Sequence, residues 1–528
     1  MKKNFGLVLG CIAMFFSLGT RAQSYFDEAL IFSRINPGGS ARIQAMGGAQ
    51  VALGGDYSTA FTNPAGLGFY NRSEGTLSIG TNFNNISSTL GSYLNGTTTN
   101  LSNGPVSDSK SNFNIPGFSI VLHSDKSNGK MISGNFAISL TRTNNFNQNI
   151  SYSGTNPYNS LIDYFIAQSN GNKPFDNGYY PSQFQSNGAS YYSLSRLAFN
   201  NFLIGPANEV TKNADSSQYH TYVDQIPLQQ EQAKITGAQN QVNFAYGLNY
   251  NDLFYLGFAV GLPSFNYHST RTYQEQFPGG PLYGFTLSED YTIKGSGINA
   301  TIGAIVRPKD FIQFGISIAT PTYFYSIADS YSATLSSGWN NYKYVDVTYT
   351  SNTRTLDGGY TDSFGDPLLA NYTLATPWRI RAGATVFIAK AGLITADVES
   401  VNYSKSSLTS QTDGLDFAQD NADIKTFYGK AMNIRLGGEY RLLKKYRIRA
   451  GYSLMPDPYA FKQYNIDNAI TGISGGLGYR TDKFFVDLGV IQSQWNAPYV
   501  VYHYTPQTPV ANLQTSNLSV MVTVGFNM

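Results

Sequence analysis

The sequence predicts an all-β protein, a 14-stranded antiparallel transmembrane β-barrel with an N-terminal hatch, or plug, inside its lumen. Three observations support this fold class. The N-terminus has the form of an export leader, only 13% of the residues are charged, and many segments alternate between apolar and polar residues. Soluble domains carry about 25% charged residues. An exported chain that is poor in charge and has no later apolar run of helix length can cross a membrane only with strands.

Residues 1–22 form the predicted signal peptide. Lys2 and Lys3 precede an apolar stretch over residues 5–18, and small residues follow up to Ala22. This order is typical of a cleaved secretory leader, and the apolar stretch is short for a membrane-spanning helix. We expect cleavage after Ala22 and export. The only cysteine, Cys11, lies in the leader, so the mature chain is expected to have neither disulfides nor a thiolate metal site.

The strands are predicted from alternation with a period of two. In segment 432–443, Met432, Ile434 and Leu436 alternate with polar or small residues such as Arg435 and Gly437. This spacing gives one lipid-compatible face and one polar face. The same reasoning predicts strands near 75–84, 113–124, 131–142, 241–251, 253–263, 294–307, 310–320, 379–388, 391–403, 432–443, 446–455, 471–481, 483–493 and 515–527.

The connections between these segments are short and long in turn. Six are short, among them Asn251-Asp252 and Lys444-Lys445, whereas the others are long. Outer-membrane barrels have short periplasmic turns and long extracellular loops. The rhythm therefore predicts both the barrel and its orientation, with the two ends of the barrel chain at the periplasmic side. A soluble all-β protein has no reason to keep such an alternation.

Two regions fall outside the predicted strands. Residues 23–73 precede the first strand and show no strand alternation, and we expect them to form the hatch, because a barrel of this size has a lumen too wide to fill with wall side chains. Residues 74–528 form the predicted barrel. Its largest extracellular loop is expected to span 143–240, and within it Ser160 to Ala167 has the spacing of a short amphipathic helix.

The hatch and several strands resemble a known family. The matching segments are 40–52, 59–67, 306–310, 375–379, 397–399, 435–441 and 449–453. Together they are similar to the FadL-type outer-membrane long-chain fatty-acid and hydrophobic-compound transporters, the outer membrane protein transport family that includes TodX-like aromatic-hydrocarbon channels. The resemblance spans nearly the whole mature chain. It implies a 14-stranded barrel with a hatch, agreeing with the periodicity.

The resemblance also implies a function and its residues. It implies a passive transporter of hydrophobic small molecules, such as long-chain fatty acids, in the outer membrane of a Gram-negative bacterium, gated by the hatch. The expected hatch and gating residues are Asn63, Pro64, Ala65, Gly66, Gly47 and Gly48, of which the first three match the family's Asn-Pro-Ala motif. By the same resemblance, Tyr25 and Phe26 are expected to line the ligand path, although they are also explained by packing of an N-terminal arm.

Arginines gather on the polar faces of neighbouring predicted strands. The expected luminal charge network consists of Arg379, Arg381, Arg435, Glu439, Arg441, Arg447 and Arg449. Such donors would hold an anionic head group. Unpaired arginines in a narrow lumen are costly, so we favour an ion-pair network that closes the periplasmic end. Its expected partners are Glu439 and the carboxylates of the hatch.

Other functions find less support in the sequence. His123, His220, His268 and His503 lie far apart, so we expect no enzyme, no metal and no cofactor. A formal charge of +2, with no basic tract longer than Lys444-Lys445, favours no nucleic-acid partner. The expected partners are a hydrophobic ligand, outer-membrane lipid and the barrel-assembly machinery, with the chain as a monomer. The alternatives are a receptor for a planar apolar ligand such as haem, and a structural or adhesive barrel.

Overall fold

The computed structural model describes residues 25–36, 38–126, 129–171, 194–206, 219–221, 223–339, 343–344, 347–348, 357–359, 368–389, 391–412 and 415–528. The predicted leader and its cleavage site lie outside the described residues. So do parts of the predicted loop 143–240, namely 172–193, 207–218 and 222.

The barrel is a single closed antiparallel sheet of 14 strands, as predicted. It closes where β1 pairs with β24 from Glu74↔Asn527 to Tyr93↔Thr508. The wall elements are β1 Glu74–Leu94, β3 Val106–Asp125, β4 Met131–Asn145, β5 Gln148–Thr155, β8 Leu228–Tyr250, β9 Phe254–Gln276, β10 Leu282–Lys309, β11 Ile312–Ala319, β12 Tyr323–Trp339, β16 Leu368–Ala375, β17 Arg379–Ile388, β18 Gly392–Asn402, β19 Ser407–Ser410, β20 Lys430–Leu442, β21 Tyr446–Met455, β22 Ile470–Arg480, β23 Phe484–Val500 and β24 Thr508–Asn527.

Some barrel strands consist of two elements in line. Both β4 and β5 pair with β8, and both β11 and β12 pair with β10. In the same way β16 continues β17, and β19 continues β18. Proline causes two of these interruptions, because Pro321 and Pro377 lack the backbone N–H that a ladder needs.

Helices and short strands complete the described chain. They are α1 Tyr25–Ser33, α2 Ala41–Gln44, α3 Thr59–Thr62, the 3-10 helix η1 Pro64–Phe69, β2 Thr97–Asn100, α4 Leu161–Gly171, α6 Leu194–Asn200, β6 Gly205–Pro206, β7 Tyr219–His220, β13 Lys343–Tyr344, β14 Val347–Thr348, β15 Asp357–Gly359, the 3-10 helix η3 Tyr403–Lys405 and α8 Ala418–Phe427. Helix α4 confirms the helix predicted from Ser160 to Ala167. Among the described residues, no helix is long and apolar enough to cross a bilayer.

The outer face of the wall carries an apolar band at the short-turn end. On β8, outward-facing Phe244, Tyr246 and Tyr250 are 41%, 41% and 40% exposed. The band covers residues 242–250 of this strand. With a rise of about 3.4 Å per residue and a tilt of about 40°, it is roughly 23 Å tall, close to the apolar band of outer-membrane barrels. Beyond the band the same face carries exposed Gln232 and Lys234.

The strands run past this band at the long-loop end, which the sequence did not predict. β8 begins at Leu228 rather than 241, and β9 continues to Gln276 rather than 263. As a result β5 and β8 occupy both ends of the expected loop 143–240, which is correspondingly shorter. The reason is the solvent: above the band the outward face is polar, so the apolar-out alternation stops although the ladder continues.

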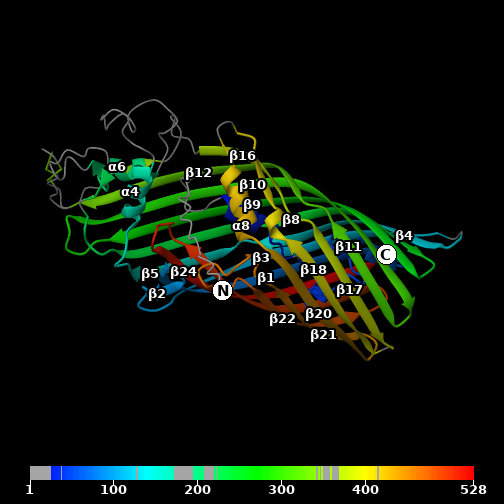
Figure 1. The fold of residues 1–528 in the computed structure, drawn as a ribbon. Coiled ribbons are helices and arrows are strands. Elements are labelled where there is room, and N and C mark those ends of the chain that lie inside the picture. Colours follow the sequence, from blue (N-terminus) through cyan, green and yellow to red (C-terminus); the bar gives the residue numbers. More distant parts are fainter. Residues whose placement is uncertain are drawn as a thin grey trace, which may run out of the picture.

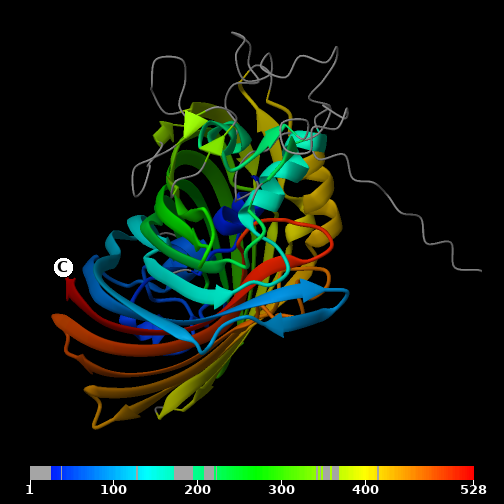
Figure 2. The same ribbon diagram turned by 90° about the vertical axis from the view of Figure 1, so that its left-hand side faces the viewer.

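Figures 1 and 2 show the arrangement of the parts. The short turns gather at one end of the barrel, and α4 and α6 lie at the opposite end (Figure 1). The N-terminal segment, coloured dark blue, lies inside the ring of strands (Figure 2). The C-terminus lies at the short-turn end, where Met528 N donates to Ser73 O at 2.9 Å. The hatch therefore joins the wall at that end.

Candidate functional site in the barrel lumen

The lower lumen, next to the short turns, is filled by residues 38–73, which we call the hatch body. Its fold is held by capping side chains: Ser40 Oγ accepts from Ile43 N at 3.2 Å and begins α2. Ser40 Oγ also donates to Asp56 Oδ2 at 2.6 Å, and Ser58 Oγ donates to Asp56 Oδ1 at 2.7 Å. The hatch body thus satisfies its own carboxylate internally.

Asn63 and Pro64 form a turn that begins η1. Asn63 Oδ1 accepts from Ala65 N at 3.2 Å, and the backbone carbonyl of Asn63 accepts from Gly66 N at 2.9 Å. Asn63 Nδ2 donates to Val51 O at 2.6 Å, which ties the turn to an earlier part of the hatch. Pro64 stands at the first turn of η1, where its missing N–H costs nothing. The side chain of Asn63 is therefore a cross-brace of the hatch body.

Gly47 and Gly48 make a second turn, at the end of α2. Their φ angles are 67° and 80°, in the left-handed region that favours glycine. Gly47 N donates to Ser474 Oγ of β22 at 3.0 Å. The two glycines are thus required by the turn that brings the hatch backbone against the wall.

The predicted arginines form two clusters of ion pairs, which are buried except at Arg441, whose side chain is 38% exposed. In the first, Glu399 of β18 lies 2.6 Å from Arg381 Nε, 3.3 Å from Arg379 Nη1 and 3.6 Å from Arg435 Nη2. Asn433 Nδ2 also donates to Glu399 Oε1 at 2.8 Å. The carboxylate is enclosed by donors on every side, as a buried charge requires.

The second cluster surrounds Glu439 of β20. Arg449 Nε lies 2.9 Å away and Arg42 of the hatch 3.5 Å away, whereas Arg441 and Arg447 are more distant at 3.8 and 3.7 Å. Arg449 Nη1 also pairs with Asp487 Oδ1 at 2.6 Å.

Glu439 is a partner of these arginines, as expected, but the part taken by the hatch differs from the expectation. The hatch contributes a cation, Arg42, rather than the expected carboxylates. The partner carboxylates Glu399, Glu439 and Asp487 belong to the wall. Cross-strand register explains this, since Arg381↔Glu399 and Glu439↔Arg449 are direct neighbours in the sheet.

Above the hatch body the lumen becomes aromatic. We define the aromatic chamber by the buried wall residues Phe146, Phe265, Tyr267, Tyr273, Phe285, Tyr291, Phe324, Tyr331 and Tyr372. Most of these side chains come from the strand extensions that lie beyond the apolar band. Inward-facing Phe265, Tyr267 and Tyr273 alternate along β9 with polar outward residues. The sequence signal for the chamber is an alternation of the opposite polarity: beyond the apolar band, apolar residues face the lumen and polar residues face outward.

Helix α1 occupies this chamber. The ring of Phe32 stacks on Phe265, with centroids 3.9 Å apart and an interplanar angle of 13°. Tyr25 packs edge-on against Tyr372 at 5.3 Å and Phe417 at 4.8 Å. Tyr372 and Tyr291 both donate hydroxyl hydrogen bonds to the buried carboxylate of Glu28.

The start of α1 is held by the segment that contains α8. Phe26 N donates to Asp420 Oδ1 at 3.2 Å, and Tyr428 Oη donates to Phe26 O at 2.8 Å. Burial raises the pKa of Asp420, and the hydrogen bond from Phe26 opposes part of this rise. The structure thus places Tyr25 in the aromatic chamber and Phe26 against α8.

The long-loop end of the chamber is covered by α4 and α6. Phe165 of α4 and Leu197 of α6 are buried in the same apolar cluster as α1. The start of α4 is anchored to β9, where Glu275 Oε1 accepts from Leu161 N at 2.8 Å. A polar network that we did not predict joins the neighbouring strands β8, β9 and β10. Arg271 lies 2.8 Å from Glu231 and 2.9 Å from Glu289, and its Nη2 donates to Val501 O at 2.9 Å. Among the described residues, α4 and α6 therefore cover the long-loop end of the chamber.

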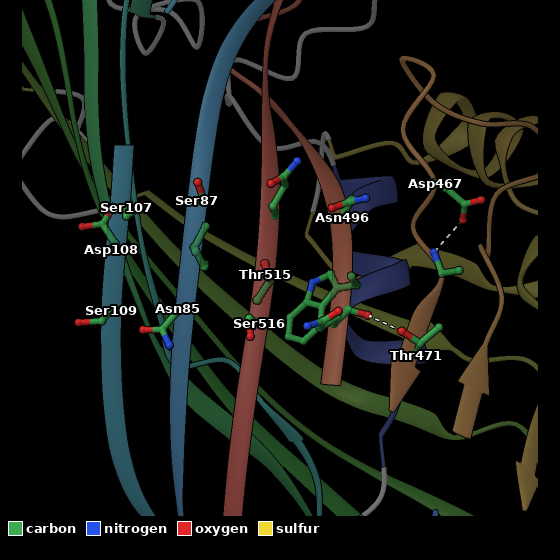
Figure 3. A pocket seen from close by; sticks show the side chains of 15 residues that line it. Asn85, Ser87, Ser107, Asp108, Ser109, Asp467, Thr471, Asn496, Thr515 and Ser516 are labelled. Atoms are coloured by element: carbon green, nitrogen blue, oxygen red, sulfur yellow. Dashed lines mark hydrogen bonds between the residues drawn. The ribbon is translucent and has the colours of Figure 1, made fainter. Parts of the chain in front are cut away.

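Hollows occur at several places. A polar pocket of about 900 Å³ lies where β1, β3, β23 and β24 pass beyond the apolar band (Figure 3). Its exposed lining residues include Asn85, Ser107, Ser109 and Asn496, so it faces water rather than lipid. A cavity of about 20 Å³ lies under α1, beside Phe32 and Arg379. Within the described ranges no group of His, Cys, Asp and Glu residues could hold a metal ion.

Comparison with solved structures supports the fold. No known family profile and no curated protein matches the chain. A FadL homologue from Pseudomonas aeruginosa aligns over 93% of this chain and 99% of its own, with a TM-score of 0.53 and 11% identity.

Two toluene transporters align less closely. TbuX of Ralstonia pickettii and TodX of Pseudomonas putida each cover 93% of this chain and 98% of their own, with TM-scores of 0.46 and 0.45 and identities of 14% and 12%. The chain therefore shares the fold of that FadL homologue, which confirms at that level the FadL-type resemblance seen in its sequence.

Proposed function

We propose that this protein is a passive transporter of hydrophobic small molecules in the bacterial outer membrane, gated by its N-terminal segment. The observation that carries the proposal is the aromatic chamber, buried inside a lipid-belted barrel and occupied by the chain's own α1. Long-chain fatty acids or similar apolar compounds are the ligand class. The outer apolar band supports the membrane location, because such a belt is stable only against lipid.

The lining of the chamber selects the ligand class. A channel for hydrophilic solutes has a polar, water-filled interior. This chamber is lined mainly by aromatic rings. Its buried carboxylates are paired with tyrosine hydroxyls, Glu28 with Tyr291 and Tyr372, Glu275 with Tyr273, and Glu289 with Tyr331. Sites of this kind bind apolar ligands and use a few polar groups to orient them.

Helix α1 supplies the gate in this proposal. Phe32 and Tyr25 fill positions on the chamber wall that an apolar ligand would contact. A ligand that binds better when α1 is displaced shifts the equilibrium toward the displaced state. Tyr25 and Phe26 then line the ligand path, which opens when they move away with α1. The hatch body below closes the short-turn end.

A disulfide lock tests this gate. Ser33 Oγ at the end of α1 lies 3.4 Å from Ser406 Oγ, and both residues are buried. Ser33→Cys with Ser406→Cys should therefore cross-link under oxidising conditions. The chain's only natural cysteine, Cys11, lies in the predicted leader, so no competing disulfide is expected in the mature protein.

Uptake is measured in a Gram-negative host that lacks its own transporter, with a labelled long-chain fatty acid and an aromatic hydrocarbon as probes. We expect the oxidised lock to stop uptake, reductant to restore it, and each single-cysteine variant to transport normally. Folded barrel is quantified by its shifted mobility in unheated gels. Transport through the oxidised lock contradicts the gate. Binding of the probes without uptake by the unmodified protein would instead describe a receptor.

A further inference from the structure

A polar hollow lies on the outside of the wall, where β22, β23, β24, β1 and β3 pass beyond the apolar band. It is the pocket of about 900 Å³ that Figure 3 shows from close by. Its outward side chains are all hydroxyls or amides, and we call them the polar groove: Asn85, Ser87, Ser107, Ser109, Gln494, Asn496, Gln514 and Ser516. The groove therefore crosses several neighbouring strands and faces away from the aromatic chamber.

Cross-strand register arranges these side chains in two rows. The lower row, nearer the apolar band, consists of the successive partners Gln494, Ser516, Asn85 and Ser109. The upper row consists of the successive partners Asn496, Gln514, Ser87 and Ser107. Cross-strand partners have Cβ atoms about 4.5–5.5 Å apart. Each row is therefore a continuous line of hydrogen-bonding groups across β23, β24, β1 and β3.

The groove continues the lipid-facing side of the same strands. On β1, outward Leu77, Ile79 and Phe83 are 46%, 41% and 43% exposed, and Asn85 is the next residue on that face. A step of two residues rises about 5 Å along the membrane normal when the strand tilts by about 40°. Head-group regions add roughly 5–7 Å to each side of the hydrocarbon core. The groove therefore begins at the depth of the hydrated head groups.

Most side chains of the groove keep their hydrogen-bonding capacity for a ligand. Ser516 Oγ accepts from Gln492 Nε2 at 2.9 Å. Among the described residues, the other side chains of the groove have no hydrogen-bonding partner. A serine hydroxyl and an Asn or Gln amide can each donate and accept. The groove therefore offers both kinds of group, side by side, to a molecule that has many hydroxyls.

The charges around the hollow decide against a phosphate ligand. Its lining, all of it within the described residues, contains no Lys or Arg, the residue types that bind phosphate. It contains two acids. Asp467 stands at the rim, where its Oδ2 lies 3.1 Å from Lys462 Nζ, and Asp108 belongs to the inward-facing set of β3. The chemistry that fits this lining is an uncharged saccharide.

We propose that the polar groove binds the saccharide head group of a glycolipid in the outer leaflet of the bacterial outer membrane. Short turns are periplasmic in such barrels, so a groove beyond the band at the long-loop end lies in the outer leaflet. The acyl chains of the same lipid pack on the apolar band below, where Phe83 and Phe113 are 43% and 67% exposed. The proposal shares the membrane location of the proposed function but does not depend on transport.

Lipid retention tests the groove. Asn85→Trp fills it, and Ser87→Trp replaces that variant if it does not fold. Gln232→Trp is the matched control, since Gln232 of β8 is also exposed beyond the band but lies outside the groove. Each protein is folded into phosphatidylethanolamine bilayers that contain rough-form lipopolysaccharide, and the glycolipid that stays bound is counted by native mass spectrometry. We expect several-fold less glycolipid on the groove variant than on the wild type and the control. Equal retention by the folded groove variant overturns the proposal.

A second measurement separates sugar from phosphate and bound lipid from free sugar. Dodecyl maltoside, which carries an uncharged disaccharide on one alkyl chain, or maltose alone is added to protein in micelles of a polyoxyethylene detergent, and the unfolding temperature is followed. We expect dodecyl maltoside to raise it in the wild type and the control, but not in the groove variant, and maltose to have little effect. No rise with dodecyl maltoside overturns the saccharide site, because lipopolysaccharide would then be held by its phosphates. An equal rise with maltose overturns the lipid as the source of the sugar. Absence of uptake would refute the proposed function and leave these outcomes unchanged.

Discussion

Neutralising the buried Glu399 should destabilise the barrel more than neutralising any single charged residue on the surface or in the loops. Glu399→Gln keeps the size of the side chain but removes the charge that three arginines share. The distances are 2.6 Å to Arg381, 3.3 Å to Arg379 and 3.6 Å to Arg435, and all four side chains are at most 10% exposed. Water therefore cannot replace the lost carboxylate.

The magnitude follows from this geometry. Removing one partner of a buried ion pair costs about 3–5 kcal/mol, because the remaining charge stays buried without compensation. Here three cations remain, so the upper part of that range is expected, reduced by whatever hydrogen bonds the amide oxygen retains. Arg381→Met in the same chain removes one of the stranded cations. The double variant should therefore recover at least about 1 kcal/mol of the loss.

The assay is denaturation by urea in detergent, followed by the mobility shift of folded barrel in gels. Asp310→Asn is the matched control, since its ion pair with Arg307 is on the surface and its side chain is fully exposed. We expect that variant to match the wild type. A loss below about 1 kcal/mol for Glu399→Gln, or strictly additive effects in the double variant, would refute the cluster as a buried charge network.

Two further predictions concern α1. Asp420→Asn keeps an oxygen that can accept from Phe26 N. Because burial raises the pKa of Asp420, its ionisation disfavours the folded state as the pH rises through that value. The variant should thus unfold at a higher temperature than the wild type near neutral pH, and the difference should disappear below about pH 4, where the carboxyl is protonated in both the folded and the unfolded state. Phe32→Ala removes the ring stacked on Phe265 and should cost about 3 kcal/mol. Added toluene should raise its unfolding temperature by filling the cavity; a response equal to that of the wild type would count against the chamber as a ligand site.

The wall was predictable where it touches lipid. Strands β17 and β21 have the predicted bounds, because apolar residues such as Ile380 and Ile448 alternate with inward arginines. The extensions of β8 and β9 were missed because their outward residues, such as Lys234, face water. An amphipathic pattern reports the solvent on each side of a strand, and it fades wherever that solvent changes.

The site was predictable only in part, for a different reason. Alternation predicts that Arg381 and Arg435 point inward. Cross-strand register decides that Glu399 is their shared partner, because it places Glu399 opposite Arg381 on one side and two residues from Arg435 on the other. Register depends on turn geometry and packing over the whole sheet. Wall glycines such as Gly437 and Gly451 likewise stand on the polar face in the sequence, yet nothing local shows that the hatch backbone lies against them.

The two halves of the lumen present opposite environments to an apolar ligand. In the aromatic chamber the ligand would replace contacts of α1 with similar contacts of its own. In the ionic layer around Glu399 and Glu439 it would have to separate buried pairs, each of which costs several kcal/mol to break, and it has no charge to offer in return. The ionic layer is therefore a barrier to the molecules that the chamber favours. An apolar ligand is expected to leave the chamber without crossing that layer.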